Sequence, residues 1–417
     1  MATLRVVSTL PNMTSCRICG GTVQEFFDFG RQPVSDAFID PNGGNTEFFY
    51  RLTVGHCTTC SMVQQLKEVP RDRMFPGDYP YRSSGSAVMR KHFAATADRF
   101  LATELVGEDP FYVEIGCNDG ILLGAISRAG VRHLGVDPAE SAVEVAREQG
   151  CRVRSCFFEE ATGAEIRAAE GPAQLIFSAN TISHIGYIES IFAGADALLA
   201  PGGAFVFEDR YLGDIVEHAY FDQIYDEHFY LFGVRSVQNM AQRFGFELVD
   251  VEHLPVHGGA MRYTTARAGE RAPTPAVAEW LASEEKQRLA EPEVYTEFGA
   301  RVEANCRALV ELLTSLRAEG RSVVGYGATS KSATVTNYCG IGPDLIPFIC
   351  DSTREKQGRL TPGARIPILP PDAFSDPYPD YALLFAWNHA EEVMAKEQAF
   401  REAGGRWILY VPDVHIV

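Results

Sequence analysis

A short polar segment, Tyr225-Asp-Glu-His-Phe-Tyr, places a phenol, two carboxylates and an imidazole close together in the chain. An imidazole takes up and hands on protons near neutral pH, and a neighbouring carboxylate can orient or charge it. The composition of this segment is therefore typical of general acid–base catalysis. A solvated polar loop would have a similar composition, so the surrounding elements must distinguish the two interpretations.

Upstream of this segment, a glycine-rich turn follows a predicted strand that begins at Phe111. The turn has the pattern Glu114-x-Gly116-x-Asn118-x-Gly120 and leads into a helix. Glycines at such a turn let a ligand approach the backbone closely. Asn118 replaces the middle glycine, and asparagine tolerates the left-handed conformation better than most side chains. These positions are candidate cofactor contacts, although such a pattern is weak evidence when it stands alone.

A second predicted strand, Leu134-Gly-Val-Asp137, ends in an acid about 20 residues after the glycine turn. An acid at this place accepts hydrogen bonds from the ribose hydroxyls of a nucleotide cofactor. Glu114 adds a second negative charge, which suits the sulfonium and ammonium groups of S-adenosylmethionine and would repel the phosphates of NAD. We therefore predict S-adenosylmethionine as the cofactor, with Asp137 on its ribose. The alternative role for Asp137 is that of a helix N-cap.

Strands and helices alternate through this region, which predicts a doubly wound α/β sheet. Ligands of such sheets bind at the carboxyl ends of the strands. Asn180 and His184 directly follow a predicted strand at residues 175–178, so we expect them at this edge, with Asn180 as a further cofactor contact. The polar segment follows the fifth strand, and the chain can fold it back over the same edge. A lone histidine such as His184 is also commonly a structural residue.

Two Cys-x-x-Cys pairs, Cys16/Cys19 and Cys57/Cys60, lie in the N-terminal part of the chain. A two-residue spacer lets both thiolates of a pair face one ion, and two pairs make a tetrahedral four-sulfur site. Such a site leaves no coordination position open, so we predict structural Zn²⁺. The alternative is a redox-active pair, against which two pairs without a thioredoxin-like context argue.

The loop at residues 75–86 precedes a predicted helix, which Ser84 or Ser86 can cap. It carries aromatic, basic and hydroxyl side chains that could contact a ligand, and its tyrosines could equally be packed in a turn. The candidate substrate contacts are Tyr81, Arg82 and Ser83, and Tyr79 is a candidate for the chemistry itself.

The C-terminal third contains a second strand-turn-helix pattern, Gly325-Tyr-Gly-Ala-Thr-Ser330-Lys331, which nearly matches a dinucleotide fingerprint. Backbone amides at a helix N-terminus bind phosphate, and Lys331 adds a positive charge. The loop at residues 351–359 is locally basic in an acidic chain. We predict that a pyrophosphate binds here; the alternative is a degenerate Rossmann unit with a solvated loop. The candidate contacts are Ser330, Lys331, Arg354, Lys356 and Arg359.

Length and composition limit the remaining possibilities. A chain of 417 residues favours roughly three domains. We place a zinc-binding domain at 1–75, a cofactor domain at 76–270 and a second Rossmann-like α/β domain at 271–417. The net charge of −18 argues against nucleic acid and anionic membranes as partners. No apolar run approaches the ~20 residues of a membrane span, and the N-terminus does not resemble a signal peptide, so we expect a cytoplasmic protein, as a monomer or weak homodimer.

Together these motifs resemble the three-domain nucleotide-sugar C-methyltransferases of bacterial deoxysugar biosynthesis. The resemblance rests on the paired Cys-x-x-Cys motifs, Glu114-Ile-Gly-Cys-Asn-Asp-Gly, Asn180-Thr-Ile-Ser-His-Ile, Tyr225-Asp-Glu-His-Phe-Tyr, His257-Gly-Gly-Ala-Met-Arg and Gly325-Tyr-Gly-Ala-Thr-Ser-Lys-Ser. They occur in the family's order over nearly the whole chain. The resemblance implies methylation of a dTDP-linked 4-keto-deoxysugar in antibiotic biosynthesis, more commonly at carbon 3, with carbon 5 as the main competitor.

In the reaction that the resemblance implies, a base removes the proton next to the ketone and the enolate takes up the methyl group. His228 is the candidate base, and Glu227 orients or charges it. Tyr79 and Tyr225 could donate to the enolate oxygen. His184 could polarise the ketone or relay the proton. The sequence does not decide whether His228 or Tyr225 takes the proton.

Two other classes of function stay open at this point. An NAD-dependent oxidoreductase would use Gly325, Gly327 and Asp351 as its cofactor site, but it leaves the first glycine turn unexplained. An interaction protein without chemistry would account for the zinc module, but two complete α/β units are more than it needs.

Overall fold

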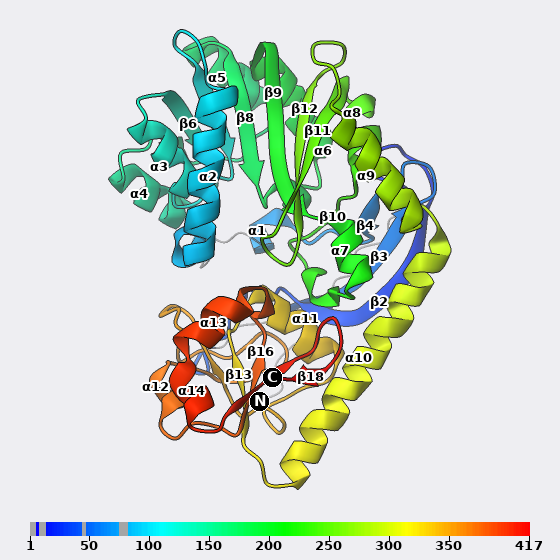
Figure 1. Ribbon diagram of the computed structural model, residues 1–417, viewed down its shortest axis with the longest axis vertical. Helices are drawn as coiled ribbons and strands as arrows, with labels where there is room; N and C mark the ends of the chain where they lie inside the picture. The colour runs from blue at the N-terminus through cyan, green and yellow to red at the C-terminus, as the bar shows by residue number, and fades with distance from the viewer. Residues whose placement is uncertain (1–5, 8–13, 44–46, 75–81) are drawn as a thin grey trace.

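The computed structural model describes residues 6–7, 14–43, 47–74 and 82–417, which Figure 1 colours along the chain. These residues form three sheets. Tyr79 and Tyr81 lie outside the described residues, so their roles stay predictions. Within the described ranges, no helix combines the length and the apolar character that crossing a membrane requires.

The central sheet has seven strands in the order β11-β12-β9-β8-β5-β6-β7. The strands are β5 (Phe111–Ile115), β6 (Arg132–Val136), β7 (Val153–Arg154), β8 (Ala173–Ala179), β9 (Leu199–Arg210), β11 (Phe246–Leu254) and β12 (Ala260–Arg267). β5 to β9 pair in parallel, whereas β12 is antiparallel to β9 and β11. The strand order reverses at β5, which places a ligand crevice at the carboxyl ends of the strands. The predicted doubly wound α/β fold is confirmed.

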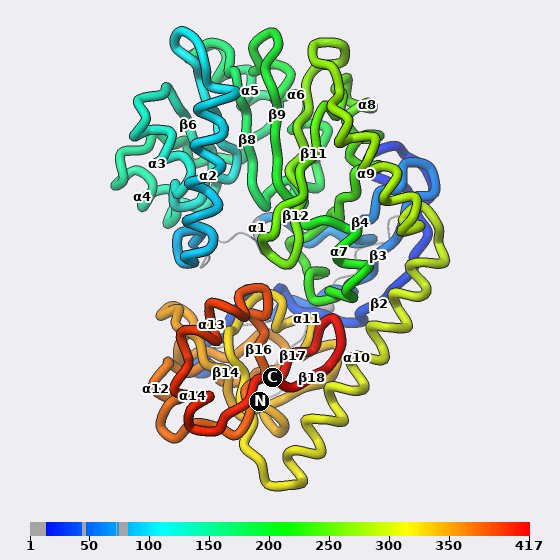
Figure 2. Tube along the Cα trace, in the orientation of Figure 1, coloured from blue at the N-terminus to red at the C-terminus, as the bar shows by residue number. Residues whose placement is uncertain are grey.

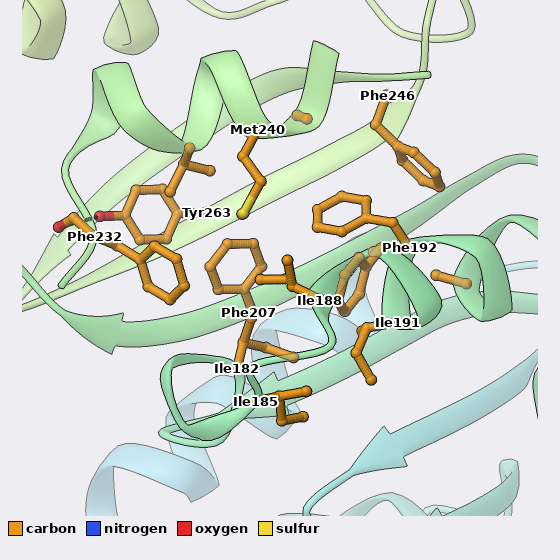
Figure 3. Packing of buried hydrophobic residues seen from close by; sticks show 14 of the residues in the cluster. Ile182, Ile185, Ile188, Ile191, Phe192, Phe207, Phe232, Met240, Phe246 and Tyr263 are labelled. Atoms are coloured by element: carbon orange, nitrogen blue, oxygen red, sulfur yellow. Dashed lines mark hydrogen bonds between the residues drawn. The ribbon is translucent and has the colours of Figure 1, made fainter. Parts of the chain in front are cut away.

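Helices cover both faces of this sheet because successive strand residues point to opposite sides (Figures 1 and 2). Tyr112 packs among residues of α2, α3 and α4, whereas Phe111 and Val113 face α5, α6 and α8. Figure 3 shows the second cluster, in which the rings of Phe207 and Tyr263 lie 5.0 Å apart. The helices are α2 (Ala87–Thr103), α3 (Ile121–Arg128), α4 (Glu140–Glu148), α5 (Glu160–Glu170), α6 (Ile188–Leu198) and α8 (Val234–Arg243).

The N-terminal sheet contains a strand from a distant part of the chain. Its strands are β1 (Val6–Val7), β2 (Val23–Pro33), β3 (Phe48–Cys57), β4 (Val63–Gln65) and β10 (Tyr230–Leu231). β10 begins within the polar segment and pairs antiparallel with β4, with Tyr230 opposite Gln64. Residues 1–75 therefore do not build this sheet alone, and the predicted boundary at residue 75 stays a prediction.

The C-terminal sheet has the order β15-β14-β13-β16-β17-β18, and only its last strand is antiparallel to its neighbour. The strands are β13 (Val323–Tyr326), β14 (Ile349–Cys350), β15 (Ile368–Leu369), β16 (Tyr381–Leu384), β17 (Arg406–Leu409) and β18 (His415–Ile416). The helix α11 (Ser330–Tyr338) follows β13 through the predicted turn. The predicted second Rossmann-like unit is therefore present.

Helices also connect the units. α9 (Pro275–Lys286) ends before Pro292, where α10 (Pro292–Ala318) begins, so the predicted break at this proline is confirmed. α10 runs past β2 toward the C-terminal sheet (Figure 1). The remaining helices are α1 (Arg71–Met74), α7 (Leu212–Glu217), α12 (Asp372–Ser375), α13 (Ala390–Lys396) and α14 (Gln398–Glu402).

Candidate active site and metal centre

The four predicted metal ligands meet at one point. The Sγ atoms of Cys16, Cys19, Cys57 and Cys60 all lie within 4.8 Å of one another. Backbone amides support the thiolates, because the N–H of Gly21 lies 3.3 Å from the Sγ of Cys19. A side chain on Gly21 would meet the Oγ1 of Thr59 at 2.5 Å, which explains the glycine in this knuckle. Four sulfur donors fill a tetrahedral shell, so this centre holds a structural Zn²⁺.

The first glycine turn has the backbone that its sequence predicted. Gly116, Asn118 and Gly120 have φ angles of +71°, +47° and +77°. A side chain on Gly116 would meet Thr181 at 2.2 Å, so this position requires glycine for packing as well as for conformation. The turn opens onto a cavity of about 1060 Å³ that continues into open solvent.

Most of the predicted cofactor contacts line this cavity. Its walls include Glu114, Gly116, Asn118, Asp137 and Asn180, and Gly120 ends the turn as the N-cap of α3. This set fits S-adenosylmethionine, because two buried carboxylates face a space that a cationic ligand can enter.

Each of these two carboxyl groups is held in place by the protein. Glu114 accepts a hydrogen bond from the hydroxyl of Tyr112 at 3.1 Å, and burial raises its pKa well above the usual value. A ligand cation beside it would favour the ionised form. Asp137 accepts the N–H of Asn118 and the N–H of Ala139, both at 2.8 Å. The N-cap of α4 is Ala139, so Asp137 braces the glycine turn and is not itself the N-cap residue.

Other residues of the cavity were not apparent from the sequence. Phe157 and Phe158 follow β7 and line the cavity together with Tyr187. Arg71 reaches the cavity from α1 of the N-terminal unit, with its guanidinium 4.3 Å from the ring centre of Phe157. It also forms an ion pair with Glu159 at 2.7 Å. No local sequence signal links Arg71 to these partners, because they are brought together by the packing of separate units.

A histidine of the polar segment, His228, lies beside a histidine of the cavity wall, His184. The ring centroids of His184 and His228 are 5.3 Å apart, and His184 lines the cavity. The Nδ1 atom of His228 lies 2.5 Å from the carbonyl oxygen of Gln223. A carbonyl only accepts, so Nδ1 carries the hydrogen and Nε2 of the neutral ring carries the lone pair. This Nε2 is buried and has no hydrogen-bond partner among the described residues.

Electrostatics keep these groups neutral. Burial, together with nearby Arg210 and His184, places the pKa of His228 well below its usual value. Burial and Arg210 lower the pKa of His184 to about 3. The ring of Tyr225 lies 4.0 Å from that of His228, and burial raises the pKa of this phenol well above its usual value. The cluster therefore combines one available imidazole lone pair with a protonated phenol.

The structure shows a backbone partner for the ring of His228. Its Nδ1–H donates to the backbone carbonyl of Gln223, and the side chain of Gln223 in turn donates to the carbonyl of His257 at 2.8 Å. Glu227 is buried beside His228 in the chain, and its role as an orienting group stays a prediction. A backbone acceptor leaves no side-chain signature, so sequence reasoning could not identify it.

The N-terminal sheet positions this catalytic loop. The side chain of Gln65, in β4, donates to the carbonyl oxygens of Tyr225 at 2.6 Å and His228 at 2.9 Å. The backbone N–H of Gln65 donates to the carbonyl of Phe229 at 2.8 Å. Asp226 accepts the N–H of Ser35 at 2.9 Å. The hairpin of β3 and β4, which carries the zinc ligands Cys57 and Cys60, thus also fixes the loop that carries the candidate base.

The predicted substrate contacts separate into two groups. Ser83 lines the cofactor cavity, and its N–H donates to Asn118 at 3.1 Å. Arg82 donates to the hydroxyl of Ser141 at 3.0 Å, just after Asp137. These two contacts lie at the cofactor turn and not at the second turn.

The second group lies at the N-terminus of α11 and in the following loop. Lys331 donates to Asn388 at 2.8 Å, and burial lowers its pKa to about 8. Ser330 donates to Asp36 at 2.9 Å, and Lys356 donates to the carbonyl of Ala328 at 2.9 Å. Two other predicted contacts, Arg354 and Arg359, are exposed.

Comparison with known proteins places these sites in a family. Three family models match in sequence, with the descriptions "Putative zinc binding domain" at residues 16–75, "Methyltransferase domain" at 89–251 and "C-methyltransferase C-terminal domain" at 255–412. The C-methyltransferase NovU of Streptomyces niveus is 34% identical over 407 residues, covering 96% of both chains.

Two further matches cover smaller shares of the chain. The ubiquinone biosynthesis O-methyltransferase of Nitrosococcus oceani is 29% identical over 99 residues, which is 23% of this chain and 41% of that protein. The crystal structure of magnesium protoporphyrin IX methyltransferase from Synechocystis has a TM-score of 0.33 and 11% identity, over 43% of this chain and 79% of that chain.

A match to NovU that extends from the zinc ligands to the C-terminal unit excludes both the oxidoreductase and the interaction protein. The chain belongs to the C-methyltransferase family and is a zinc-containing enzyme that uses S-adenosylmethionine.

Proposed function

We propose that this enzyme removes a proton from the carbon next to the ketone of a dTDP-linked 4-keto-deoxysugar and methylates the resulting enolate at carbon 3, in antibiotic deoxysugar biosynthesis. The observation that supports this most directly is the buried Nε2 of His228, which has no partner among the described residues and lies beside a histidine of the cofactor cavity. A carbon next to a ketone becomes nucleophilic only after such a base has acted.

The protonation states of His228, Tyr225 and His184 support a separate catalytic role for each. His228 is neutral, so its Nε2 can accept the proton from the substrate C–H bond. Tyr225 stays protonated, so it can donate a hydrogen bond to the oxygen on which negative charge develops. His184 is also neutral and stands between the base and the cavity, where it can polarise the ketone. When bound, S-adenosylmethionine supplies the electrophilic methyl group.

We propose that the C-terminal unit holds the nucleotide diphosphate of the substrate. Lys331, at the first turn of α11, is close enough to His228 to contribute to its lowered pKa. A diphosphate at Lys331 would therefore direct its attached sugar toward His228. The exposed guanidinium groups of Arg354 and Arg359 have no ion-pair or hydrogen-bond partner among the described residues and support an anion nearby.

A deuterium exchange experiment tests the proposal. The protein is incubated in heavy water with dTDP-4-keto-deoxysugars and S-adenosylhomocysteine, and the sugar is analysed by mass spectrometry and NMR. We expect deuterium at carbon 3, and a methyl group at the same carbon when S-adenosylmethionine replaces the product. Exchange and methylation at carbon 5 would assign the reaction to the neighbouring position. Binding of the sugar nucleotide with neither exchange nor methylation would contradict the proposal.

A further inference from the structure

Arg210 is a cation that the sequence motifs did not single out and that contacts Asn180 in the wall of the cofactor cavity. It is the last residue of β9, at the carboxyl end of the strand, where ligands of such sheets bind. Its side chain is only 13% exposed. A guanidinium that is largely removed from water needs acceptors for its five N–H groups, or it carries a large desolvation cost.

The described residues supply few of these acceptors. The Nη1 atom donates to the Oδ1 of Asn180 at 3.3 Å. Asp209 lies 3.8 Å from the same Nη1, but its oxygens already accept the N–H and the hydroxyl of Ser183, at 2.9 Å and 2.7 Å. The Nε atom of Arg210 is buried and has no hydrogen-bond partner among the described residues. The guanidinium thus retains donors that can bind an incoming oxygen.

The groups around Arg210 define where that oxygen lies. Asn180, its acceptor, lines the cofactor cavity. Arg210 acts electrostatically on His184, His228 and Tyr225, the three side chains of the candidate chemistry. It also acts on two groups that lie toward the C-terminal unit, His257 and Lys331. Apart from Asp209, these neighbours are neutral or positive, so no second carboxylate in this set competes with a negative ligand.

We propose that Arg210 is a catalytic residue that holds the enolate oxygen formed when the substrate loses its proton. The inference rests on the proposed function, because a ketone oxygen becomes negative only if the neighbouring carbon is deprotonated. The C–H bond breaks, its proton moves to Nε2 of His228, and its electron pair becomes the enolate whose oxygen faces the guanidinium. A fixed cation at this place stabilises the charge as it develops and needs no reorganisation.

The test measures deuterium exchange at the substrate carbon, kcat and substrate KM for Arg210→Gln and Arg210→Lys. Removal of one such donor typically lowers the rate about 10²–10³-fold, and we expect this loss in both exchange and kcat for Arg210→Gln. Arg210→Lys should restore part of the rate because it keeps the charge. The Kd for S-adenosylmethionine reports whether the variants are folded, and Arg243→Gln, an exposed arginine of α8, is the matched control.

A pH profile separates this role from a structural one. Burial lowers the pKa of His228 most, Arg210, His184 and Lys331 lower it further, and the hydrogen bond to the Gln223 carbonyl raises it. Arg210→Gln should therefore raise that pKa and move the acid limb of kcat/KM to higher pH. Exchange within about threefold of wild type, or an increase in KM at unchanged kcat as expected of a phosphate contact, would overturn the inference. If the wild-type enzyme shows no deuterium exchange at the substrate carbon, the proposed function itself is wrong, and the inference about Arg210 is wrong with it.

Discussion

The two glycine turns of this chain have the same local construction. Gly116 and Gly327 both have positive φ angles, +71° and +85°. Each turn is followed by a strand that ends in an acid, and each acid braces the turn through backbone N–H groups. Asp137 accepts the N–H of Asn118 at 2.8 Å, and Asp351 accepts the N–H of Ala328 at 2.8 Å. On local geometry alone, the two turns would be expected to bind similar ligands.

Their surroundings differ. The first turn opens onto the cavity that Glu114 lines. At the second turn, residues of the N-terminal unit contact the turn and the loop after it: Ser330 donates to Asp36, and Lys356 lies 5.0 Å from the ring centre of Phe38. The comparison shows that a glycine motif predicts the turn and its acid, whereas the groups that surround each turn are contributed by distant segments.

We expect the largest loss of activity from substitution of the candidate base, His228. His228→Asn removes the lone pair that accepts the proton, so kcat and deuterium exchange should fall by about 10²–10⁴-fold. The Kd for S-adenosylmethionine should change little, because His228 does not line its cavity. His415→Asn, at a ring 37% exposed on the C-terminal strand, serves as the control. Wild-type exchange in His228→Asn would assign the base to another group.

The two acids provide the most direct test of the comparison. Asp137→Asn should weaken binding of S-adenosylmethionine by about 10–100-fold, the range expected for loss of one hydrogen bond to a charged group. Asp351→Asn should leave that Kd unchanged. Both variants should lower the melting temperature by a similar amount, since both acids brace turns. Calorimetric titration and thermal unfolding of the two variants check this. Equal loss of cofactor affinity in both would show that the second turn also binds it.

The pH dependence of KM tests whether Lys331, at the second turn, binds the phosphate of the substrate. Its pKa is about 8 because burial disfavours the charged form, so the side chain loses its positive charge as the pH rises through this value. KM for the sugar nucleotide should therefore increase about tenfold between about pH 7 and about pH 9.5, as one charge-assisted contact to phosphate is lost. Lys331→Arg should show a flat KM over this range, because arginine stays charged. The same increase in Lys331→Arg would mean that another group titrates.

Features that rest on neighbouring residues in sequence could be predicted. The spacing of the cysteines gave the zinc ligands, Asn118 has the left-handed backbone that its place in the turn requires, and Pro292 begins a new helix. In each of these, the side chain and the feature that it causes lie within a few residues of one another. The alternation of predicted strands and helices was likewise sufficient to predict the central sheet.

Contacts between distant segments could not be predicted. Arg210 ends a strand whose sequence only indicates burial, and its proposed role rests on the side chains that packing brings around it. Gln65 and the loop at Tyr225 are separated by 160 residues and meet because β10 joins the N-terminal sheet. A glutamine in a short strand carries no sign of such a partner. The missing information is thus the arrangement of the units, which one sequence does not contain.

The smallest predicted effect concerns this contact. Gln65→Met keeps the size of the side chain but removes the donors to the carbonyls of Tyr225 and His228. The loop should then lose about 1 kcal/mol of support, and kcat should fall about three- to tenfold while KM for both substrates is retained. Gln24→Met, an exposed glutamine in β2 of the same sheet, is the control and should behave as wild type.

Zinc content and cofactor affinity determine how a loss of kcat in Gln65→Met is interpreted. If the variant keeps its zinc and its Kd for S-adenosylmethionine, a lower kcat reports displacement of His228 and Tyr225, because among the described residues Gln65 is neither a metal ligand nor part of the cavity wall. An unchanged kcat would mean that β10 and the Ser35–Asp226 contact are sufficient to hold the loop. The N-terminal unit would then position the loop through the pairing of β4 with β10 and through Ser35, and not through the side chain of Gln65.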